Sequence, residues 1–295
     1  MIHRYQKKGL NFVLDVNSGA VHLLDDISYA VSGLIDENMT EKCPESVVEA
    51  LPQYAADDVR EAYGELYELK KAGQLFAEDD YIDVSRYIPV GAPVKALCLH
   101  VAHDCNLRCK YCFASTGDFG QGRKIMPPEV AKKAIDFVIA RSGKRRNIEV
   151  DFFGGEPLMA WDTVTQTVDY ARSIEEQHGK KFRFTITTNG LLLDEDKRRY
   201  INENMDNCVL SLDGRREVND EFRKTVAGTG SYDTIVPKFK ALVDERDPNL
   251  DYYARGTFTS HNLDFAEDVL SIADAGFDRL SVEPVTADPG CGYDL

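Results

Sequence analysis

The chain has 295 residues, of which 43% are hydrophobic, so it is long enough for one α/β barrel or two ordinary domains with a substantial core. These figures exclude a disordered or fibrous chain. The formal net charge of −15 disfavours nucleic acid or an anionic membrane as the main partner. The N-terminus has no apolar signal segment, and no run approaches the roughly 18 apolar residues of a membrane helix. We therefore expect a cytoplasmic protein without a nucleic-acid or membrane partner.

Residues 1–80 have the pattern of a small acidic domain, with 16 acidic and 7 basic side chains. Short apolar runs on both sides of the Asn-Ser-Gly turn at 17–19 predict a hairpin and two or three strands. Three amphipathic segments follow. The longest, 57–71, repeats apolar residues at spacings of three and four and ends before Gly73. This order predicts a winged-helix-like β3α3 domain.

Residues 81–93 contain two prolines and a glycine without helical periodicity, and we interpret them as a linker. In residues 94–295, strands alternate with amphipathic helices, which predicts βαβ units around a parallel sheet. Cys98 and Cys208 lie in predicted strands between apolar neighbours, so we expect both in the core. The predicted strands are 94–101, 148–153, 182–188, 208–212, 252–258 and 280–283, and the predicted helices are 128–140, 161–177, 195–203, 232–243 and 265–273.

Six strands with five helices predict a partial (β/α)6 barrel, an α/β fold in which the last strand lacks its covering helix. A parallel strand is normally covered on both faces. We therefore expect the chain to be part of a longer one, with a C-terminal extension absent.

Three cysteines, Cys105, Cys109 and Cys112, follow the first predicted strand of this region with the spacing C-x3-C-x2-C. Active sites of parallel α/β folds lie at the carboxyl ends of the strands. Three thiolates from one loop can bind three irons of a cubane cluster and leave the fourth iron open for chemistry. The alternative is a zinc site with His100 or His103 as fourth ligand, although structural zinc more often uses cysteine pairs from two hairpins.

The segment Cys105-Asn-Leu-Arg-Cys109-Lys-Tyr-Cys112 closely resembles the signature of the radical S-adenosylmethionine (SAM) enzymes. In that family the amino and carboxylate groups of SAM chelate the open iron, and one electron cleaves SAM to a 5′-deoxyadenosyl radical. The resemblance implies a [4Fe-4S] cluster on these three cysteines, SAM as cosubstrate, and an electron donor such as flavodoxin or ferredoxin.

Further strand ends resemble other motifs of this family. The sequence Gly-Gly-Glu-Pro at 154–157 resembles the GGEP motif, which binds the amino group of SAM. Asp213 and Thr257 belong to similar strand ends, where hydrogen-bonded turns are the plain alternative. Ser211 and Arg255 resemble residues that reach the ribose and carboxylate of SAM. The residues expected to bind the cofactor are Gly154, Gly155, Glu156, Asn189, Ser211 and Arg255; the sequence identifies no further catalytic side chain.

Residues 1–80 resemble the precursor-recognition domains of enzymes that modify ribosomally made peptides. The resemblance implies that a leader peptide is added as a strand beside residues 20–24 and against the helix at 57–71. With the core, the chain is similar to peptide maturases with SPASM-type extensions, of the type that acts on "six cysteines in forty-five" peptides. That implies thioether crosslinks in a cysteine-rich precursor with a leader, and auxiliary [4Fe-4S] clusters in the missing C-terminal region.

Two alternatives remain open. One is a radical SAM enzyme of another kind, either an anaerobic sulfatase-maturing enzyme that forms formylglycine or an enzyme that forms carbon–carbon crosslinks. The other is a protein without catalytic activity that holds zinc or an iron-sulfur cluster and binds peptides.

Overall fold

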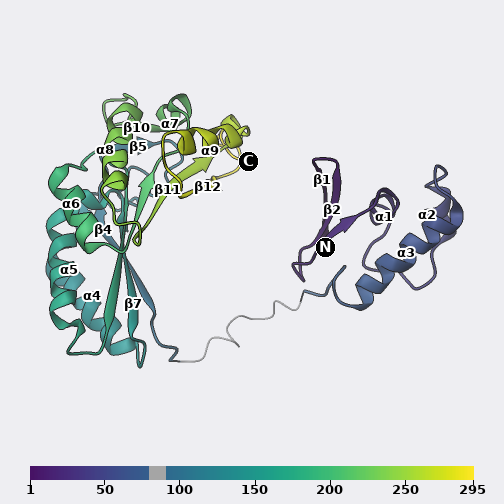
Figure 1. The fold of residues 1–295 in the computed structure, drawn as a ribbon, viewed down its shortest axis with the longest axis horizontal. Helices are drawn as coiled ribbons and strands as arrows, with labels where there is room; N and C mark the ends of the chain where they lie inside the picture. The colour runs from purple at the N-terminus through teal and green to yellow at the C-terminus, as the bar shows by residue number, and fades with distance from the viewer. Residues whose placement is uncertain (80–90) are drawn as a thin grey trace. The chain divides into compact units, whose positions relative to one another are not determined.

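The computed structural model describes residues 1–79 and 91–295. The chain divides into two compact units, Met1–Ala92 and Pro93–Leu295, and each has a hydrophobic core of its own. Figure 1 shows both units; each is described by itself. Most of the predicted linker at 81–93 lies outside the described residues.

The first unit consists of a three-stranded antiparallel sheet followed by three helices. The strand order is β1-β2-β3, so β2 is the central strand. The Asp25 carboxylate accepts a hydrogen bond from the backbone N–H of Ser28 at 2.7 Å and caps the first helix. The elements are β1 (Ile2–Lys7), β2 (Leu10–Asp15), β3 (Val21–Leu24), α1 (Asp26–Ser32), α2 (Glu45–Glu49) and α3 (Ala56–Lys71).

The core of the first unit lies between one face of this sheet and the helices. Alternate residues of β2 are buried, because successive side chains of a strand point to opposite faces. Val13 from this face, Val31 from α1 and Tyr63 from α3 are all almost completely buried. Helix α3 contributes Val59, Ala62 and Leu66 to the same core.

The second unit is built on a seven-stranded sheet in the order β12-β11-β9-β8-β7-β4-β6. Every neighbouring pair is parallel except that β6 runs antiparallel to β4. The sheet is therefore mostly parallel, as the alternation of strands and helices predicted. Its strands are β4 (Ala96–His103), β6 (Lys124–Ile125), β7 (Asn147–Gly154), β8 (Lys181–Thr188), β9 (Asn207–Ser211), β11 (Asp251–Phe258) and β12 (Leu280–Pro284).

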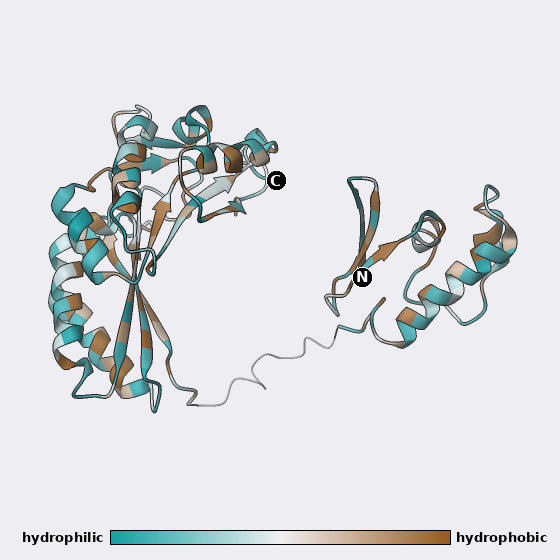
Figure 2. Ribbon diagram, in the orientation of Figure 1, coloured by the Kyte–Doolittle hydropathy of each residue, from teal (hydrophilic) through white to brown (hydrophobic). Residues whose placement is uncertain are grey.

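Helices α4, α5 and α6 lie side by side along one face of the sheet in Figure 1, and apolar positions follow the central strands in Figure 2. The core between these layers includes Phe152, Phe184 and Phe239, which are completely buried. The helices of this unit are α4 (Pro128–Arg141), α5 (Trp161–Glu175), α6 (Glu195–Asn204), α7 (Arg216–Phe222), α8 (Tyr232–Asp244) and α9 (Phe265–Asp274). Within the described part of the chain, no helix is long and apolar enough to cross a membrane.

Several short elements were not predicted. Helix α7 and the strands β5 (Leu107–Cys109), β6 and β10 (Arg223–Thr225) are too short to show a period in the sequence. One cysteine prediction was also wrong, since Cys98 is exposed while Cys208 is buried. In β4, Leu99 and Val101 point into the core. Successive side chains of a strand point to opposite faces, so Cys98 lies on the other face of β4.

Candidate functional site

The three cysteines of the motif lie in the segment that follows β4. The Cys105 backbone N–H binds the Asp104 carboxylate at 2.9 Å, and the Cys112 N–H binds the Cys109 carbonyl at 3.1 Å. Burial raises the pKa of Cys105 to about 11 and is the largest cause of the rise at Cys109, whose pKa is raised to about 12. At Cys109 the charge of Arg223 opposes this increase, while that of Asp213 adds to it. Cys105 and Cys109 therefore favour the neutral thiol until a metal ion displaces their protons.

The zinc alternative finds no geometric support in residues 1–79 and 91–295, where no group of three His, Cys, Asp or Glu side chains is arranged to hold a single metal ion. His100 instead stacks on Phe119 with the ring centroids 4.9 Å apart, and the His103 ring lies tilted against the same ring at 4.8 Å. In a cubane cluster each thiolate binds a different iron.

The two glycines of the Gly-Gly-Glu-Pro sequence pack directly against the start of the cysteine loop. A Cβ atom on Gly154, whose φ is +130°, would lie 2.4 Å from the Ala102 carbonyl oxygen. A Cβ atom on Gly155 would lie 2.2 Å from the carbonyl oxygen of Asp104. Hydrogen bonds from the N–H groups of Gly155 to Ala102 and of Glu156 to Asp104, at 2.7 and 2.9 Å, join the segments. Only glycine permits this approach, which brings the two motifs together.

Glu156 directly follows the two glycines and is almost completely buried. One carboxylate oxygen accepts hydrogen bonds from the Leu158 N–H at 3.0 Å and the Thr188 hydroxyl at 2.8 Å, and the other accepts from the Asn189 N–H at 2.8 Å. Burial raises its pKa to about 7, although the hydrogen bonds, led by that from Asn189, oppose the increase. The carboxylate therefore joins the ends of β7 and β8, and its expected contact with the SAM amino group stays a prediction.

Asn189 is a predicted cofactor-binding residue whose side chain forms hydrogen bonds with the cysteine loop. It follows the last residue of β8, and its side-chain amide donates to the Asn106 side-chain oxygen at 2.8 Å and to the Cys105 sulfur at 3.6 Å. Its backbone N–H holds Glu156 at the same time. Asn189 therefore connects the cysteine loop to the Gly-Gly-Glu-Pro segment.

Ser211 and Arg255 are placed next to each other, since they are paired residues in the parallel register of β9 and β11. The Arg255 guanidinium forms an ion pair with Glu283, and both side chains are about half exposed. The hydrogen bonds among the described residues do not connect either predicted residue to the cysteine loop. Their roles toward SAM therefore stay predictions.

A buried network that the sequence did not reveal lies on the other side of the cysteine loop. The Tyr111 hydroxyl donates to the Asp213 carboxylate at 2.6 Å, and the Arg223 Nε lies 3.0 Å from the same oxygen. Burial raises the pKa of Tyr111, and the charge of Arg223 opposes this effect. Asp213 was noted as part of a strand end, but no local pattern marks Arg223, which is 114 residues from Cys109 in the sequence.

A group of three aromatic side chains, one of them exposed, lies beside the last cysteine. The Phe113 side chain is 72% exposed, and its ring centroid lies 6.3 Å from that of Phe153 at the end of β7. Phe119 lies 6.0 Å from Phe113. Phe119 and Phe153 are half-buried, so Phe113 is the exposed member of this group of rings.

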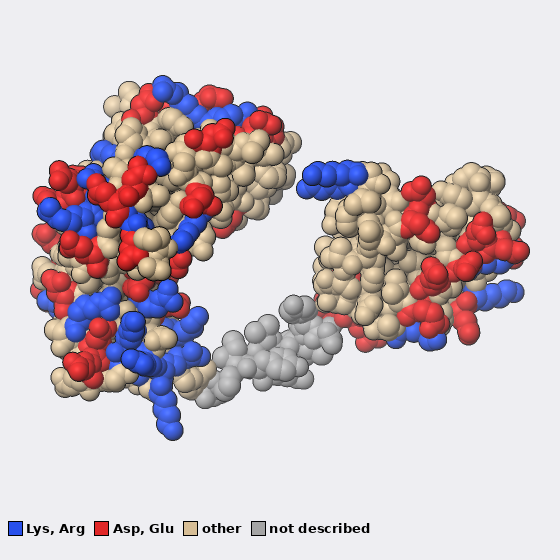
Figure 3. All heavy atoms as spheres, in the orientation of Figure 1, with Lys and Arg blue, Asp and Glu red and all other residues tan. Residues whose placement is uncertain are grey.

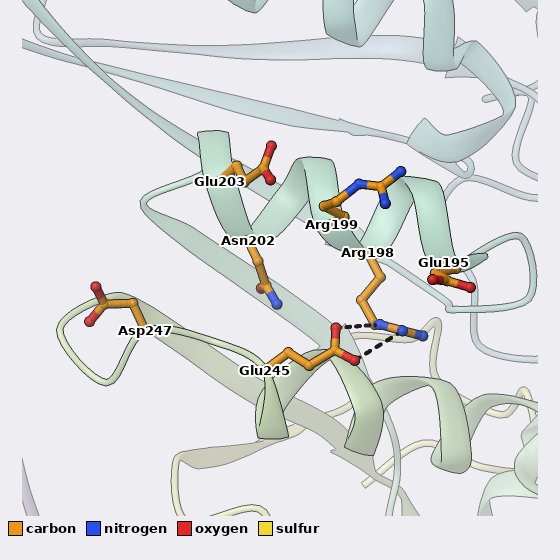
Figure 4. A pocket seen from close by; sticks show the side chains of 7 residues that line it. All are labelled: Glu195, Arg198, Arg199, Asn202, Glu203, Glu245 and Asp247. Atoms are coloured by element: carbon orange, nitrogen blue, oxygen red, sulfur yellow. Dashed lines mark hydrogen bonds and ion pairs between the residues drawn. The ribbon is translucent and has the colours of Figure 1, made fainter.

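A charged pocket elsewhere on the second unit is separate from this site (Figure 4). It lies between α6 and the region following α8. The Arg198 guanidinium points toward Glu245 across it and is paired with that carboxylate at 2.8 Å. None of the residues that line this pocket belongs to the motifs described above.

Comparison with known proteins identifies the family of this second unit. The model of the radical SAM superfamily matches residues 99–253, which is more than half of the chain. The matched region contains the three cysteines, the two glycines and Glu156. The chain belongs to the radical SAM superfamily.

Two enzymes of known type are similar to this chain over part of its length. The chain is 30% identical over 197 residues to the radical SAM cyclopropyl synthase TigE of Paramaledivibacter caminithermalis, a match that covers 61% of this chain and 40% of TigE. It is 29% identical over 143 residues to the cysteine-type anaerobic sulfatase-maturating enzyme of Clostridium novyi, covering 47% of this chain and 37% of that enzyme. The chain thus spans less than half the length of these two relatives.

The fold is also similar to that of a solved structure described as native anSMEcpe with bound AdoMet and Cp18Cys peptide. The TM-score is 0.60 at 21% identity, and the similarity covers 69% of this chain and 55% of that chain. At this identity the likeness concerns the fold alone. The second unit has the α/β radical SAM fold.

The residues present fit the cofactors that the superfamily implies, a [4Fe-4S] cluster and SAM. Three cysteines from one loop provide three sulfur ligands. The glycine junction beside that loop leaves no room for side chains, so backbone groups of residues 154–155 lie directly at the metal-binding segment. Cys105, Cys109 and Cys112 would hold the cluster, which supplies the electron that cleaves SAM.

Proposed function

We propose that this radical SAM enzyme installs thioether crosslinks, from cysteine sulfur to carbon, in a ribosomally made cysteine-rich precursor peptide. A cysteine loop joined to the Gly-Gly-Glu-Pro segment supports SAM cleavage. Peptide recognition is supported by the N-terminal unit, which has a strand edge that is unpaired among the described residues. This edge is the observation that carries the proposal.

Strand β3 is an edge strand, since its only sheet neighbour within the described residues is β2. Val21 and Leu23 on β3 are 57% and 61% exposed. The His22 ring is 2.8 Å from the carbonyl oxygen of Gln74, which places β3 near the end of α3. A free edge with exposed apolar side chains can accept an extended peptide as a fourth strand.

The charge of the first unit favours a leader peptide with basic residues. Acidic side chains gather over the helices of this unit, as the red atoms in Figure 3 show. The first turn of α3 contains Asp57 and Asp58. Opposite charges of this kind accelerate association and select among partners.

The proposed reaction is a two-electron oxidation for each crosslink. The superfamily's cofactors, when bound, supply a 5′-deoxyadenosyl radical. That radical takes one hydrogen atom from a carbon of the acceptor residue and leaves as 5′-deoxyadenosine. The peptide thiol loses its proton and a sulfur–carbon bond forms, which leaves one electron that an auxiliary [4Fe-4S] cluster, if bound, would accept. A flavodoxin or ferredoxin is the proposed source of the electron that cleaves SAM.

The first experiment tests SAM cleavage. After anaerobic reconstitution with iron and sulfide, the chain is expected to show iron-sulfur absorption and to release 5′-deoxyadenosine in the presence of dithionite and SAM. The Cys105→Ala/Cys109→Ala/Cys112→Ala variant should lose both properties. A Cys98→Ala/Cys291→Ala variant, which removes two exposed cysteines outside the loop, is the matched control and should retain them. SAM cleavage by the triple variant would contradict the assignment.

The second experiment tests the peptide. With the native enzyme, a precursor encoded beside its gene should lose two mass units for each thioether. Tandem mass spectra should lack backbone fragment ions from the segment between two crosslinked residues. Leader binding, measured by fluorescence anisotropy, should weaken in a Val21→Ser/Leu23→Ser variant. It should persist in Leu10→Ser, which changes an exposed residue on the central strand β2.

A second candidate is suggested by the named relatives, which include sulfatase-maturating enzymes and a cyclopropyl synthase. Formylglycine formation would produce a carbonyl that reacts with a hydrazide probe. A carbon–carbon crosslink would leave every cysteine thiol free for alkylation. Either outcome with the native enzyme would replace thioether formation as the function.

A further inference from the structure

The middle cysteine of the loop is held by a small sheet that is separate from the main one. Strand β5 pairs antiparallel with β10, so that Cys109 lies opposite Arg223. The next backbone N–H, that of Lys110, binds the Phe222 carbonyl at 3.0 Å. The short α7–β10 segment therefore fixes the backbone of a predicted cluster ligand.

The same segment places a buried pair of opposite charges beside Cys109. Asp213 is completely buried and Arg223 is 9% exposed, and their side chains lie 3.0 Å apart. The other Asp213 oxygen accepts the Thr257 N–H at 3.0 Å, which fixes the carboxylate to β11. The Arg223 guanidinium also lies over the ring of Tyr111, 5.5 Å from its centroid, and that tyrosine donates to Asp213.

The backbone around Arg223 is fixed by two buried polar side chains. The Ser231 hydroxyl donates to the Arg223 carbonyl at 2.7 Å, and the Asn219 side chain donates to that hydroxyl at 3.2 Å. Ser231 and Asn219 are completely buried. Charges held in such an interior are screened weakly by water and salt, so they act strongly on neighbouring groups.

We propose that Asp213 and Arg223 are positioning residues of the cysteine loop, and that their opposite charges set the reduction potential of the cluster bound at Cys109. Reduction adds one negative charge to the cluster. Arg223 therefore stabilises the reduced form and Asp213 destabilises it. Such electrostatic control by nearby charges and hydrogen bonds is one of the main ways in which proteins tune iron-sulfur potentials. The inference rests on membership of the superfamily and not on the peptide or the crosslink.

The test is a potentiometric titration of the anaerobically reconstituted full chain without SAM, followed by the electron paramagnetic resonance signal of the reduced cluster. We expect Arg223→Gln to lower the potential and Asp213→Asn to raise it. The Asp213→Asn/Arg223→Gln double variant should return close to the native value. Arg223→Lys, which keeps the charge, should also stay close to it. Arg246→Gln is the matched control, since Arg246 is a buried arginine bonded to the carbonyls of Met205 and Asp251 near the opposite ends of the strands.

Shifts of the two single variants in the same direction, or no shift at native iron content, would overturn the proposal. If both single variants fail to bind iron, recovery of iron in the neutral double variant would support a balance of charge at the cluster. Loss of iron in the double variant and in Arg223→Lys as well would show that the network acts only in folding, and would overturn it. None of these outcomes depends on peptide modification, so they are distinguishable from failure of the proposed function.

Discussion

Two buried carboxylates at the carboxyl ends of the sheet are arranged alike but neutralised differently. Glu156 lies two residues beyond β7 and Asp213 two residues beyond β9. Each accepts a backbone N–H from the adjacent strand region, that of Asn189 in one case and that of Thr257 in the other. Glu156 otherwise binds only uncharged donors, whereas Asp213 is paired with Arg223.

This difference divides the site into two halves. In the Glu156 half, burial without a cation raises the pKa of the carboxyl to about 7, so protonation can change near neutral pH. In the Asp213 half, a fixed cation and anion lie next to the cysteine loop. One half therefore joins neighbouring strand ends through neutral donors, while the other brings fixed charge to the metal-binding segment.

The largest expected effect is on the Glu156 half. Glu156→Ala leaves the Leu158 N–H, the Asn189 N–H and the Thr188 hydroxyl without their acceptor, and buried donors without partners are strongly unfavourable. We expect a loss of about 3 kcal/mol or more in the free energy of unfolding. Urea denaturation of the metal-free protein followed by Trp161 fluorescence measures it, since the only tryptophan lies in the second unit.

The control for this loss is a glutamate on the same strand. Glu149 is about half exposed on β7, and its carboxylate lies 3.7 Å from the Lys95 ammonium. Glu149→Ala should change the free energy of unfolding by less than about 0.5 kcal/mol, because exposed ion pairs contribute little. Equal losses in the two variants would show that burial of Glu156 is not the cause.

The pH dependence of stability should separate the two halves next. The folded-state pKa of Glu156, about 7, lies above its ordinary value of 4.5. This carboxyl therefore contributes stability that is fully present below pH 4.5 and is lost as the pH rises through 7, on the order of 3 kcal/mol in all. Glu156→Gln has no such titration, so the advantage of the native chain over this variant should shrink between pH 5 and pH 8. A difference that is constant with pH would contradict the shifted pKa.

A smaller effect is expected in the Asp213 half. Tyr111→Phe removes one hydrogen bond to a charged carboxylate and leaves the Arg223 pair in place, so we expect a loss of about 1.5–2 kcal/mol in the free energy of unfolding. Tyr170→Phe is a matched control, because the Tyr170 hydroxyl donates to Asp136 over the same 2.6 Å in an exposed position. The control should lose less than about 0.5 kcal/mol. Losses of the same size would mean that burial adds nothing to the Tyr111 bond.

The sequence predicted the parts of this site that are coded locally. The cysteine spacing and the Gly-Gly-Glu-Pro turn each lie within a few residues, and both follow strands that alternating burial and β-branched residues make recognisable. The six parallel strands were predicted for the same reason. Cys98 was placed in the core incorrectly, because its apolar neighbours point to the other face of β4.

The Asp213 half could not be predicted in the same way. Tyr111 and Asp213 are 102 residues apart, and only the folded sheet brings them together. Arg223 lies in a three-residue strand after a seven-residue helix, where no period marks either element. Glu156 was found as part of a motif, but its three bonds depend on the end of β8, so its burial and raised pKa were not visible in the sequence.

The smallest effect on stability is expected for Arg255, which offers an exposed counterpart to the buried Arg223 pair. Its guanidinium and the Glu283 carboxylate are about half exposed, and an ion pair of this kind contributes at most about 1 kcal/mol. Arg255→Gln should therefore leave the free energy of unfolding nearly unchanged. Arg255 is paired with Ser211, the last residue of β9. If Arg255 holds the SAM carboxylate, the same variant should weaken SAM binding to the reconstituted protein by at least about tenfold, the loss of roughly one charge-assisted hydrogen bond. Isothermal titration calorimetry under anaerobic conditions measures this binding, with Glu283→Gln as the control that removes the intrachain partner and keeps the arginine. An unchanged affinity for SAM in Arg255→Gln would contradict a role for Arg255 in binding the cofactor. The buried pair of Asp213 and Arg223 would then be the charged pair that this comparison leaves beside the cofactor site.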